Sequence, residues 1–216
     1  MKFYSTNNES LQISFSEAVL KGAADDGGLF MPAILPQLDT TFFDDFSNLN
    51  IKEIAFEIIK NFIDDIPKKY LIKIIDDAIT FEAPIVQLNE NLYVLELFHG
   101  PTLAFKDFGA QFLAKTISYL IQNQKKETII LVATSGDTGS AVASGFHNIE
   151  RIKVGLLYPK NKVSKIQEQQ LTTFDNNIFA FEVDGNFDDC QRLVKQAFSD
   201  NDLKNRFNLT SANSIN

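Results

Sequence analysis

The chain has 216 residues, with 28 acidic against 20 basic side chains, so its formal net charge is −8. A chain of this length in which 44% of the residues are hydrophobic can bury one or two cores, which excludes a disordered tail. The acidic excess argues against nucleic acid as a partner, and equally against a polybasic patch that binds membrane surfaces.

The sequence contains no apolar run of about 18 or more residues, so we expect no membrane span. The opening residues, MKFYSTNNES, lack the apolar segment of a signal peptide. The single cysteine, Cys190, permits no internal disulfide and fits a reducing compartment, which predicts a cytoplasmic location. With two histidines, His99 and His147, and no second cysteine, we expect no metal site.

The first third of the chain has the apolar spacing of helices. Ser16 is predicted to cap a short helix that stops at Gly22. Asn50 is predicted to cap a longer helix, and Pro67 suits the first turn of the next one. We therefore predict a mainly helical amino-terminal region over residues 1–92.

From residue 92 onward, short apolar runs alternate with amphipathic stretches. The runs cover 92–98, 128–133, 152–158, 177–183 and, more weakly, 208–212, and the amphipathic stretches lie around 107–124, 138–147, 163–171 and 187–199. This alternation predicts an α/β domain over residues 93–216, a three-layer fold in which helices cover both faces of a parallel sheet. In such sheets, ligands bind at the loops that follow the carboxyl ends of the strands.

One of these loops has the composition of an anion site. Residues 134–139, TSGDTG, follow a predicted strand and lead into a helix rich in small residues. Hydroxyls and free backbone N–H groups at a helix N-terminus suit a carboxylate or a phosphate. The spacing matches neither a nucleotide P-loop nor a dinucleotide fingerprint. The alternative is an ordinary helix capped by Ser135 or Asp137, and the pattern alone leaves both interpretations open.

A second loop, residues 99–109 (HGPTLAFKDFG), places Lys106 among phenylalanines at the start of a predicted helix. Apolar surroundings lower the pKa of a lysine and make its amine nucleophilic, which is what a Schiff base with a carbonyl cofactor requires. The alternative, which spacing alone favours, is a surface lysine paired with Asp107. From the residues themselves, the prediction stops at a parallel α/β domain with a small-anion site.

The string ELFHGPTLAFKDFG (96–109) closely resembles the cofactor-lysine segment of the threonine synthase family, which is a fold-type II family dependent on pyridoxal phosphate. Further segments resemble this family in the same order: YSTN near the start, DGGLFMP (26–32), ATSGDTGSA (133–141) and SANSIN (211–216). The resemblance covers essentially the whole chain and implies a fold like that of the tryptophan synthase β subunit.

The resemblance also implies roles for individual residues. Lys106 matches the lysine that forms the aldimine with pyridoxal 5'-phosphate and then transfers protons. The residues matching the loop that grips the substrate carboxylate beside the cofactor ring are Thr134, Ser135 and Asp137, and those matching contacts to the substrate phosphate are Thr138, Asn213 and Ser214. Many fold-type II relatives carry Asn where Asp137 stands, near the ring hydroxyl of the cofactor. The resemblance therefore also implies that Asp137 binds the cofactor, and the protonation of its carboxyl stays open.

The implied reaction converts O-phospho-L-homoserine and water into L-threonine and phosphate, a carbon–oxygen lyase step of threonine biosynthesis. Full-length members of the family are about twice as long, and their cofactor-phosphate loop has no match in this sequence. We therefore expect an amino-terminal portion of such an enzyme, with its own activity, cofactor retention, oligomeric state and effector regulation left open. Two alternatives remain: another fold-type II lyase resembling a serine or threonine dehydratase, and a non-catalytic fragment that binds a phosphorylated amino acid.

Overall fold

The computed structural model describes residues 1–212, except for the side chain of Asp45. Its centre is a parallel four-stranded sheet in the order β8-β7-β6-β9. The strands are β6 (Thr128–Ala133), β7 (Ile152–Pro159), β8 (Ile178–Val183) and β9 (Asn208–Thr210). β6 pairs with a strand on each side: its Thr128 lies opposite Ile152 of β7 and opposite Asn208 of β9.

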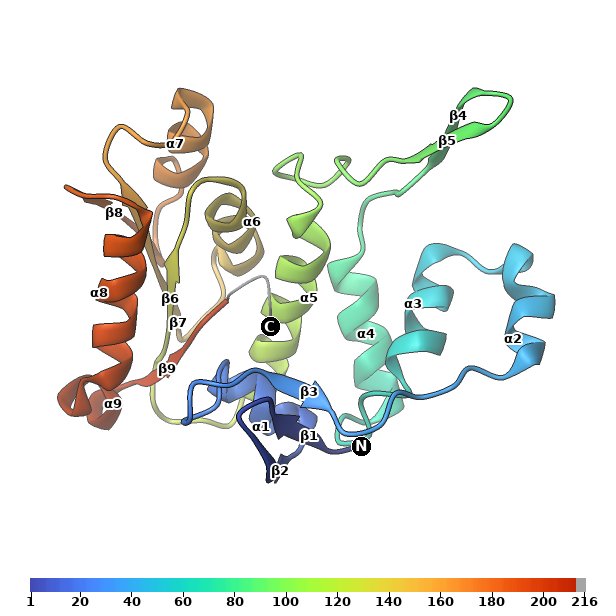
Figure 1. Cartoon of the computed structure of the whole chain (residues 1–216), viewed down its shortest axis with the longest axis horizontal. Helices are drawn as coiled ribbons and strands as arrows, with labels where there is room; N and C mark the ends of the chain where they lie inside the picture. Colours follow the sequence, from blue (N-terminus) through green and yellow to red (C-terminus); the bar gives the residue numbers. More distant parts are fainter. Residues whose placement is uncertain (213–216) are drawn as a thin grey trace.

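Helices cover both faces of this sheet, which confirms the predicted three-layer α/β fold (Figure 1). On one side lie α5 (Lys106–Leu120) and α6 (Asp137–Phe146), and on the other lies α8 (Phe187–Ser199), followed by the short α9 (Asn201–Arg206). α7 (Lys165–Thr172) stands at the edge where the parallel strands end. The four strands and four longer helices match the alternating pattern of the sequence closely.

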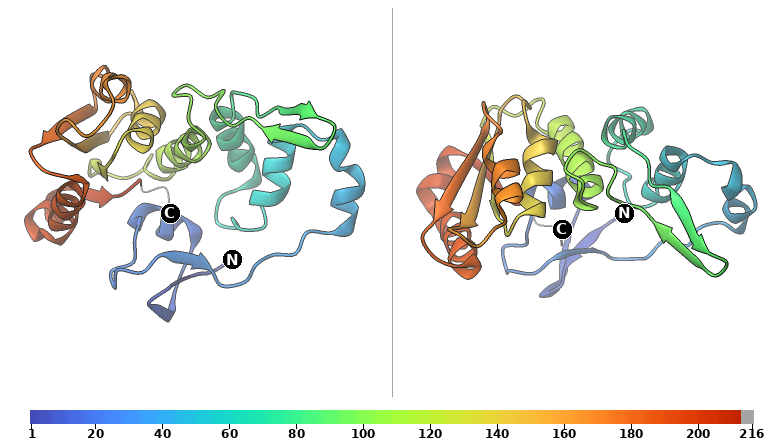
Figure 2. Two further views of the ribbon diagram at one scale, coloured as in Figure 1. Left: turned by 45° about the horizontal axis from the view of Figure 1, so that its top comes forward. Right: turned by 90° about the horizontal axis from the view of Figure 1, so that it is seen from above.

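The predicted strand at 92–98 is wrong as part of the parallel sheet. Only β5 (Leu92–Leu95) forms there, and it pairs antiparallel with β4 (Ile85–Asn89) in a separate hairpin. The reason is local, because β4 lies just across a tight turn, whereas a parallel partner needs a long crossover. The hairpin projects from the body (Figures 1 and 2), and its apolar side chains are exposed, Ile85 to 69% and Tyr93 to 58%.

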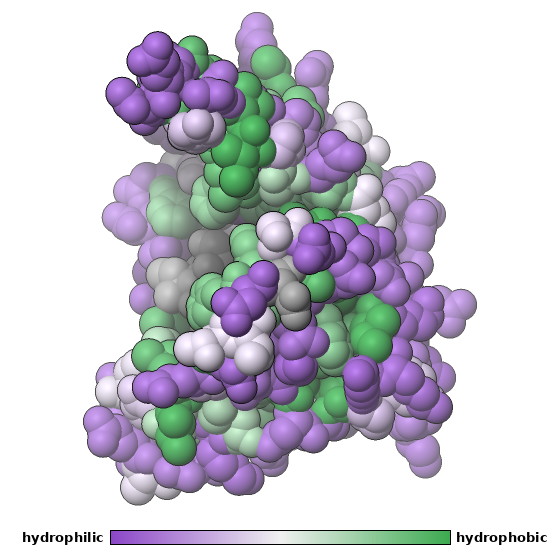
Figure 3. Space-filling model, turned by 90° about the vertical axis from the view of Figure 1, so that its right-hand side faces the viewer, coloured by the Kyte–Doolittle hydropathy of each residue, from purple (hydrophilic) through white to green (hydrophobic). Residues whose placement is uncertain are grey.

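Figure 3 shows the molecule from the hairpin side, with apolar surface exposed beside a polar tip at the top of the view.

None of the helices within residues 1–212 combines the length and apolar character that crossing a membrane requires.

The main core lies between the sheet and the pair α5 and α6. Ile130, Leu156 and Phe146 are fully buried there. The two helices pack closely because α6 carries small residues: a Cβ on Gly145 would stand 3.0 Å from the backbone oxygen of Ala110. The small residues of α6 therefore allow α5 to pack closely against it.

The amino-terminal region contains both helices and strands (Figure 2). An antiparallel sheet in the order β2-β1-β3 is built from β1 (Phe3–Ser5), β2 (Asn8–Ile13) and β3 (Phe30–Pro32). The helices are α1 (Phe15–Lys21), α2 (Thr40–Asp45), the 3-10 turn η1 (Phe46–Asn48), α3 (Ile51–Ile59) and α4 (Lys68–Ala78). α3 and α4 form a second apolar cluster, which also contacts α5.

The helix caps of this region correct one prediction and confirm two others. Ser14, not Ser16, caps α1, because only Ser14 has Glu17 three residues later to complete a capping box. The predicted stop at Gly22 is confirmed, and its φ of 73° is one that glycine adopts without strain. Asn50 caps α3 as predicted, also through a capping box.

Candidate active site

Two loops meet at the edge where the parallel strands end. α5 begins directly after the loop 99–105, and α6 begins after β6 and the turn 134–136, so both helix N-termini lie at this edge (Figure 1). α7 contacts both loops. Gln167 Nε2 donates to Asp137 Oδ1 at 2.8 Å, and Gln170 Nε2 donates to the backbone oxygen of Thr102 at 3.4 Å. Since residues three apart on a helix are neighbours, these contacts bring the two loops together.

Lys106 is the first residue of α5 and is half-buried. Its Nζ lies 4.7 Å from the ring centre of Phe105, which is itself exposed. Phe108 points away to stack edge-on against Phe81, with ring centres 4.7 Å apart. Among the described residues, Phe105 is the aromatic ring over which the Lys106 ammonium group lies.

The predicted alternative of a Lys106–Asp107 ion pair is wrong. Asp107 is fully buried, and its two carboxylate oxygens accept the backbone N–H of Thr102 at 2.9 Å and the Thr102 hydroxyl at 2.7 Å. Gly100 is required beside them, because a Cβ there would stand 2.5 Å from Asp107 Oδ2. Among the described residues, no carboxylate lies within ion-pair distance of Lys106 Nζ. The amine is left available for chemistry.

The turn before α6 is held by Thr134, which is almost completely buried. Its Oγ1 accepts the backbone N–H of Gly136 at 3.1 Å and that of Gly139 at 2.8 Å, and donates to the Gly136 oxygen at 3.2 Å. The alternative of a helix capped by Ser135 or Asp137 is therefore wrong: Gly136 occupies the cap position, and no side chain at that position bonds the helix. Gly136 has a φ of 141°, which other residues rarely adopt.

The remaining predicted ligands of this loop face solvent or lie outside the described residues. Ser135 and Asp137 are exposed, and Thr138 is half-buried. Within residues 1–212, the backbone N–H groups of Asp137 and Thr138 have no acceptor. Unpaired N–H groups and a positive helix end suit an anion. Asn213 and Ser214 lie outside the described residues, and their predicted phosphate contacts stay predictions.

Sequence reasoning missed the three residues that hold these loops together: Thr102, Gln167 and Gln170. The string Ser164–Gln167 carries the signature of a capping box, which the structure contains. That signature says nothing of the second hydrogen bond, from Gln167 to Asp137. The contact joins residues 30 apart, and the one from Gln170 to Thr102 joins residues 68 apart.

The two histidines have partners of their own. His99 Nε2 lies 2.7 Å from Glu96 Oε2, and its ring stacks on Phe98. His147 follows α6, and its Nε2 lies 3.0 Å from Asp175 Oδ1. His99 therefore shapes the loop that leads to the lysine, and His147 fastens the other end of α6.

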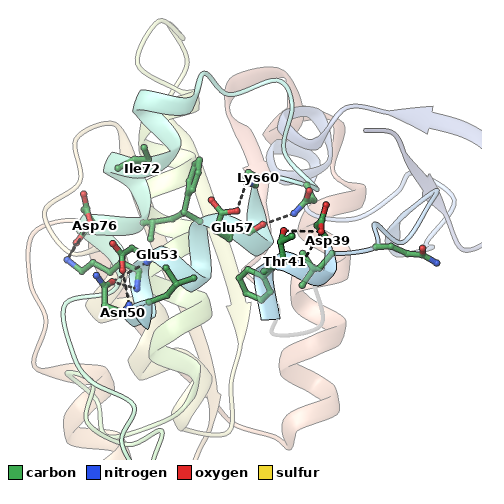
Figure 4. A pocket seen from close by; sticks show the side chains of 16 residues that line it. Asp39, Thr41, Asn50, Glu53, Glu57, Lys60, Ile72 and Asp76 are labelled. Carbon is green, nitrogen blue, oxygen red and sulfur yellow. Dashed lines mark hydrogen bonds and ion pairs between the residues drawn. The ribbon is translucent and has the colours of Figure 1, made fainter. Parts of the chain in front are cut away.

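A separate hollow of about 880 Å³ lies in the amino-terminal region, between the segment 37–42 and the helices α3 and α4 (Figure 4). Its acidic side chains are already engaged. Asp39 caps α2, Glu53 completes the capping box of α3, and Glu57 pairs with Lys60. These side chains stabilise the local helices, and the described residues offer no convergent set of free ligands in this hollow.

Comparison with known proteins agrees with this geometry. Residues 2–79 match the family described as threonine synthase N terminus, and residues 79–215 match the family of pyridoxal-phosphate dependent enzymes. The threonine synthase of Escherichia coli is 43% identical over the whole chain, which covers 50% of that protein. The threonine synthase of Saccharomyces cerevisiae is 41% identical, over 94% of this chain and 44% of its own length.

Solved structures give the same result. The crystal structure of Escherichia coli threonine synthase superimposes with a TM-score of 0.92, over 100% of this chain and 50% of that one. The pyridoxal-phosphate-bound threonine synthase of Brucella melitensis, at 37% identity, gives a TM-score of 0.89, over 100% of this chain and 48% of that one. The chain spans about half the length of the curated relatives it matches. It belongs to the pyridoxal-phosphate-dependent enzyme family and is related over its whole length to the amino-terminal portion of threonine synthases.

Proposed function

We propose that this chain supplies the lysine-bearing part of a site that converts O-phospho-L-homoserine and water into L-threonine and phosphate. Pyridoxal 5'-phosphate would be held covalently by Lys106. The observation that carries the proposal is the placement of Lys106. This residue begins α5 at the edge of the sheet where the parallel strands end, and its amine has no carboxylate partner among the described residues. The threonine synthase relatives support the choice of substrate.

The residues present fit the cofactor. Lys106 supplies a primary amine with no carboxylate partner among the described residues, and the N-terminus of α6 supplies unpaired N–H groups and a partial positive charge for the carboxylate of a bound substrate. When bound, pyridoxal phosphate supplies an electron sink that stabilises negative charge at the substrate Cα.

The chain's own residues would then bind the substrate and move its protons. The hydroxyl of Ser135 and the N–H groups of Asp137 and Thr138 would orient the substrate carboxylate. The Thr138 hydroxyl, with Asn213 and Ser214, would hold its phosphate. Lys106 Nζ would accept the proton from Cα and return protons to the neighbouring carbons, while phosphate leaves Cγ and water adds at Cβ. One lysine serves both as base and as acid in this scheme.

Thr134 would act differently from the role that the resemblance implies. Its hydroxyl is already bonded to Gly136 and Gly139 within the turn, so it would hold the loop that binds the carboxylate rather than contact the substrate. Within residues 1–212, the hydroxyls of Ser135 and Thr138 form no hydrogen bond, and the Ser135 side chain is exposed.

We also propose that the enzyme works in the cytoplasm. The support is the lone Cys190, which is buried and has no disulfide partner in the sequence.

Substrate turnover tests the reaction. Phosphate release and threonine formation from O-phospho-L-homoserine would be measured with pyridoxal phosphate, in the 216-residue chain and in its fusion to the segment that follows the matched region in the Escherichia coli relative. We expect both products from the fusion and neither from its Lys106→Ala variant. Deamination of L-serine or L-threonine without turnover of the phosphate ester would instead indicate a dehydratase. Substrate binding without product would indicate a binding fragment.

A further inference from the structure

The acidic side chain of Asp137 poses an electrostatic problem at the proposed site. Asp137 is the first residue of α6, in the turn whose free N–H groups would hold an anionic substrate. A carboxylate that turned toward that anion would repel it. The structure shows where the carboxylate lies instead, because Asp137 Oδ1 accepts a hydrogen bond from Gln167 Nε2 at 2.8 Å.

The amide of Gln167 has a fixed orientation. Its Oε1 accepts the Ser164 hydroxyl at 3.0 Å and the Ser164 backbone N–H at 3.3 Å, as part of the capping box that starts α7. Because an amide oxygen only accepts, these two donors leave the NH₂ end directed at Asp137. One side chain therefore caps α7 and binds the carboxylate of another helix.

The approach of Gln167 also depends on Gly136. A Cβ built on Gly136 would overlap the Gln167 amide group. The glycine thus leaves room for the glutamine to reach past the turn to Asp137. The contact between Gln167 and Asp137 therefore depends on three features: the glycine at position 136, the capping box of α7 and the orientation of the Gln167 amide.

We propose that Gln167 is a positioning residue that holds the Asp137 carboxylate against α7, and so keeps the turn 135–138 open to the anionic group of the ligand. This inference rests on the proposed function, since it assigns how the substrate-binding turn of that site is kept free of its own negative charge. Gln167 touches neither the substrate nor the cofactor in this role. It acts through Asp137.

The sharpest variant is Gln167→Glu, which is nearly isosteric. A Glu at this position of a capping box still accepts from Ser164, so a purely structural role predicts no change. It cannot donate to Asp137, and two carboxylates then face one another. Combining it with Asp137→Asn restores a donor, because the Asn amide can donate to the new Glu.

Two further variants and one measurement separate the effect of the lost hydrogen bond from effects of added charge and of unfolding. Gln169→Glu adds the same charge at an exposed position of the same helix. Gln167→Met removes the donor without changing the charge. The thermal unfolding midpoint of each variant shows whether it is folded.

The readout is the titration of the ¹⁵N-labelled full chain with inorganic phosphate, followed by the amide shifts of residues 135–138. We expect the unsubstituted chain to respond, and Gln167→Glu and Gln167→Met to bind phosphate about fivefold more weakly. Gln169→Glu should stay within about twofold of the unsubstituted chain, and the double variant should recover most of the loss of Gln167→Glu.

Any of four results would overturn the inference: no phosphate response in the unsubstituted chain, equal binding by Gln167→Glu, equal weakening by Gln169→Glu, or no recovery in the double variant. The proposed function fails by a different measurement, namely the absence of threonine formation by the fusion described above. An intact phosphate response in the chain, with no turnover by the fusion, would leave the positioning role standing and reject the lyase.

Discussion

The carboxylate of Asp107 receives two hydrogen bonds from a single residue, Thr102, one from its backbone N–H at 2.9 Å and one from its hydroxyl at 2.7 Å. Both partners are buried, and Asp107 completely so. The pair closes the loop directly ahead of Lys106 and places a negative charge in the first turn of α5, where the helix dipole favours it. The position of the candidate cofactor lysine therefore depends on the residue beside it.

Removing this carboxylate should destabilise the chain. In Asp107→Ala, two buried donors of Thr102 lose their acceptor, and we expect the free energy of unfolding to fall by about 3 kcal/mol. Urea denaturation followed by circular dichroism measures it. Thr102→Val removes only the hydroxyl donor and should cost about half as much. A loss below about 1 kcal/mol for Asp107→Ala would show that the pair contributes little.

Two glycines should respond in opposite directions to the same substitution. Gly136→Ala places a Cβ at a φ of 141° and against Gln167, so we expect a loss of about 2 kcal/mol in unfolding free energy. Gly109 lies within α5, and a Cβ there would have no neighbour within 4 Å. Gly109→Ala should therefore stabilise the chain by roughly 0.5 to 1 kcal/mol. Equal effects of the two substitutions in thermal unfolding would contradict the described geometry of the turn.

The turn at Asp26 should make stability sensitive to acid. A hydrogen bond from the Ser5 hydroxyl, followed by one from the Gly28 N–H, lowers the pKa of Asp26 in the folded chain. A carboxyl whose pKa is lower in the folded state contributes stability above the pKa of the unfolded state and loses it as the pH falls through the folded-state pKa. Asp26→Asn should therefore flatten the fall in the unfolding midpoint between about pH 5 and pH 2.

The control for this measurement is Asp44→Asn, which changes an exposed carboxyl in α2. We expect it to leave the acid dependence as it is in the unsubstituted chain. An acid profile of Asp26→Asn that coincides with that of the unsubstituted chain would remove Asp26 as a source of the effect.

Cys190 should be unreactive while the chain is folded. Burial, and secondarily the charge of Asp189, raises the pKa of its thiol, and the side chain is completely buried in α8. Because the thiolate is the reactive form, we expect its reaction with an aromatic disulfide reagent at neutral pH to be at least about a hundredfold slower in the native chain than in urea. Equal rates in the two conditions would show that α8 opens readily.

The sequence predicted the parallel domain well because its signals are local. Near-continuous apolar runs mark β6, β7 and β8, and apolar periodicity marks α5 and α8, without reference to distant residues. The prediction of a parallel strand at 92–98 was wrong because the signal there does not identify the partner strand. Its apolar composition is real, but its partner β4 lies only a turn away, and composition does not distinguish a hairpin from a parallel strand.

The site was predictable only in part. The unpaired N–H groups at the start of α6 follow from the predicted helix start. Lys106 was identified through the resemblance to a family rather than through its surroundings. The contacts that hold the site, from Gln167 to Asp137 and from Gln170 to Thr102, cross between elements and leave no local pattern. Such contacts need the three-dimensional arrangement of α7 over both loops.

The most direct test of the central claim is to locate the cofactor on the chain. The protein would be incubated with pyridoxal phosphate, reduced with borohydride, digested, and its labelled peptide identified by mass spectrometry. We predict labelling at Lys106 that disappears in Lys106→Ala and persists in Lys115→Ala, a control further along the same helix. Labelling spread over other lysines, or unchanged in Lys106→Ala, would contradict the assignment of Lys106 as the cofactor lysine.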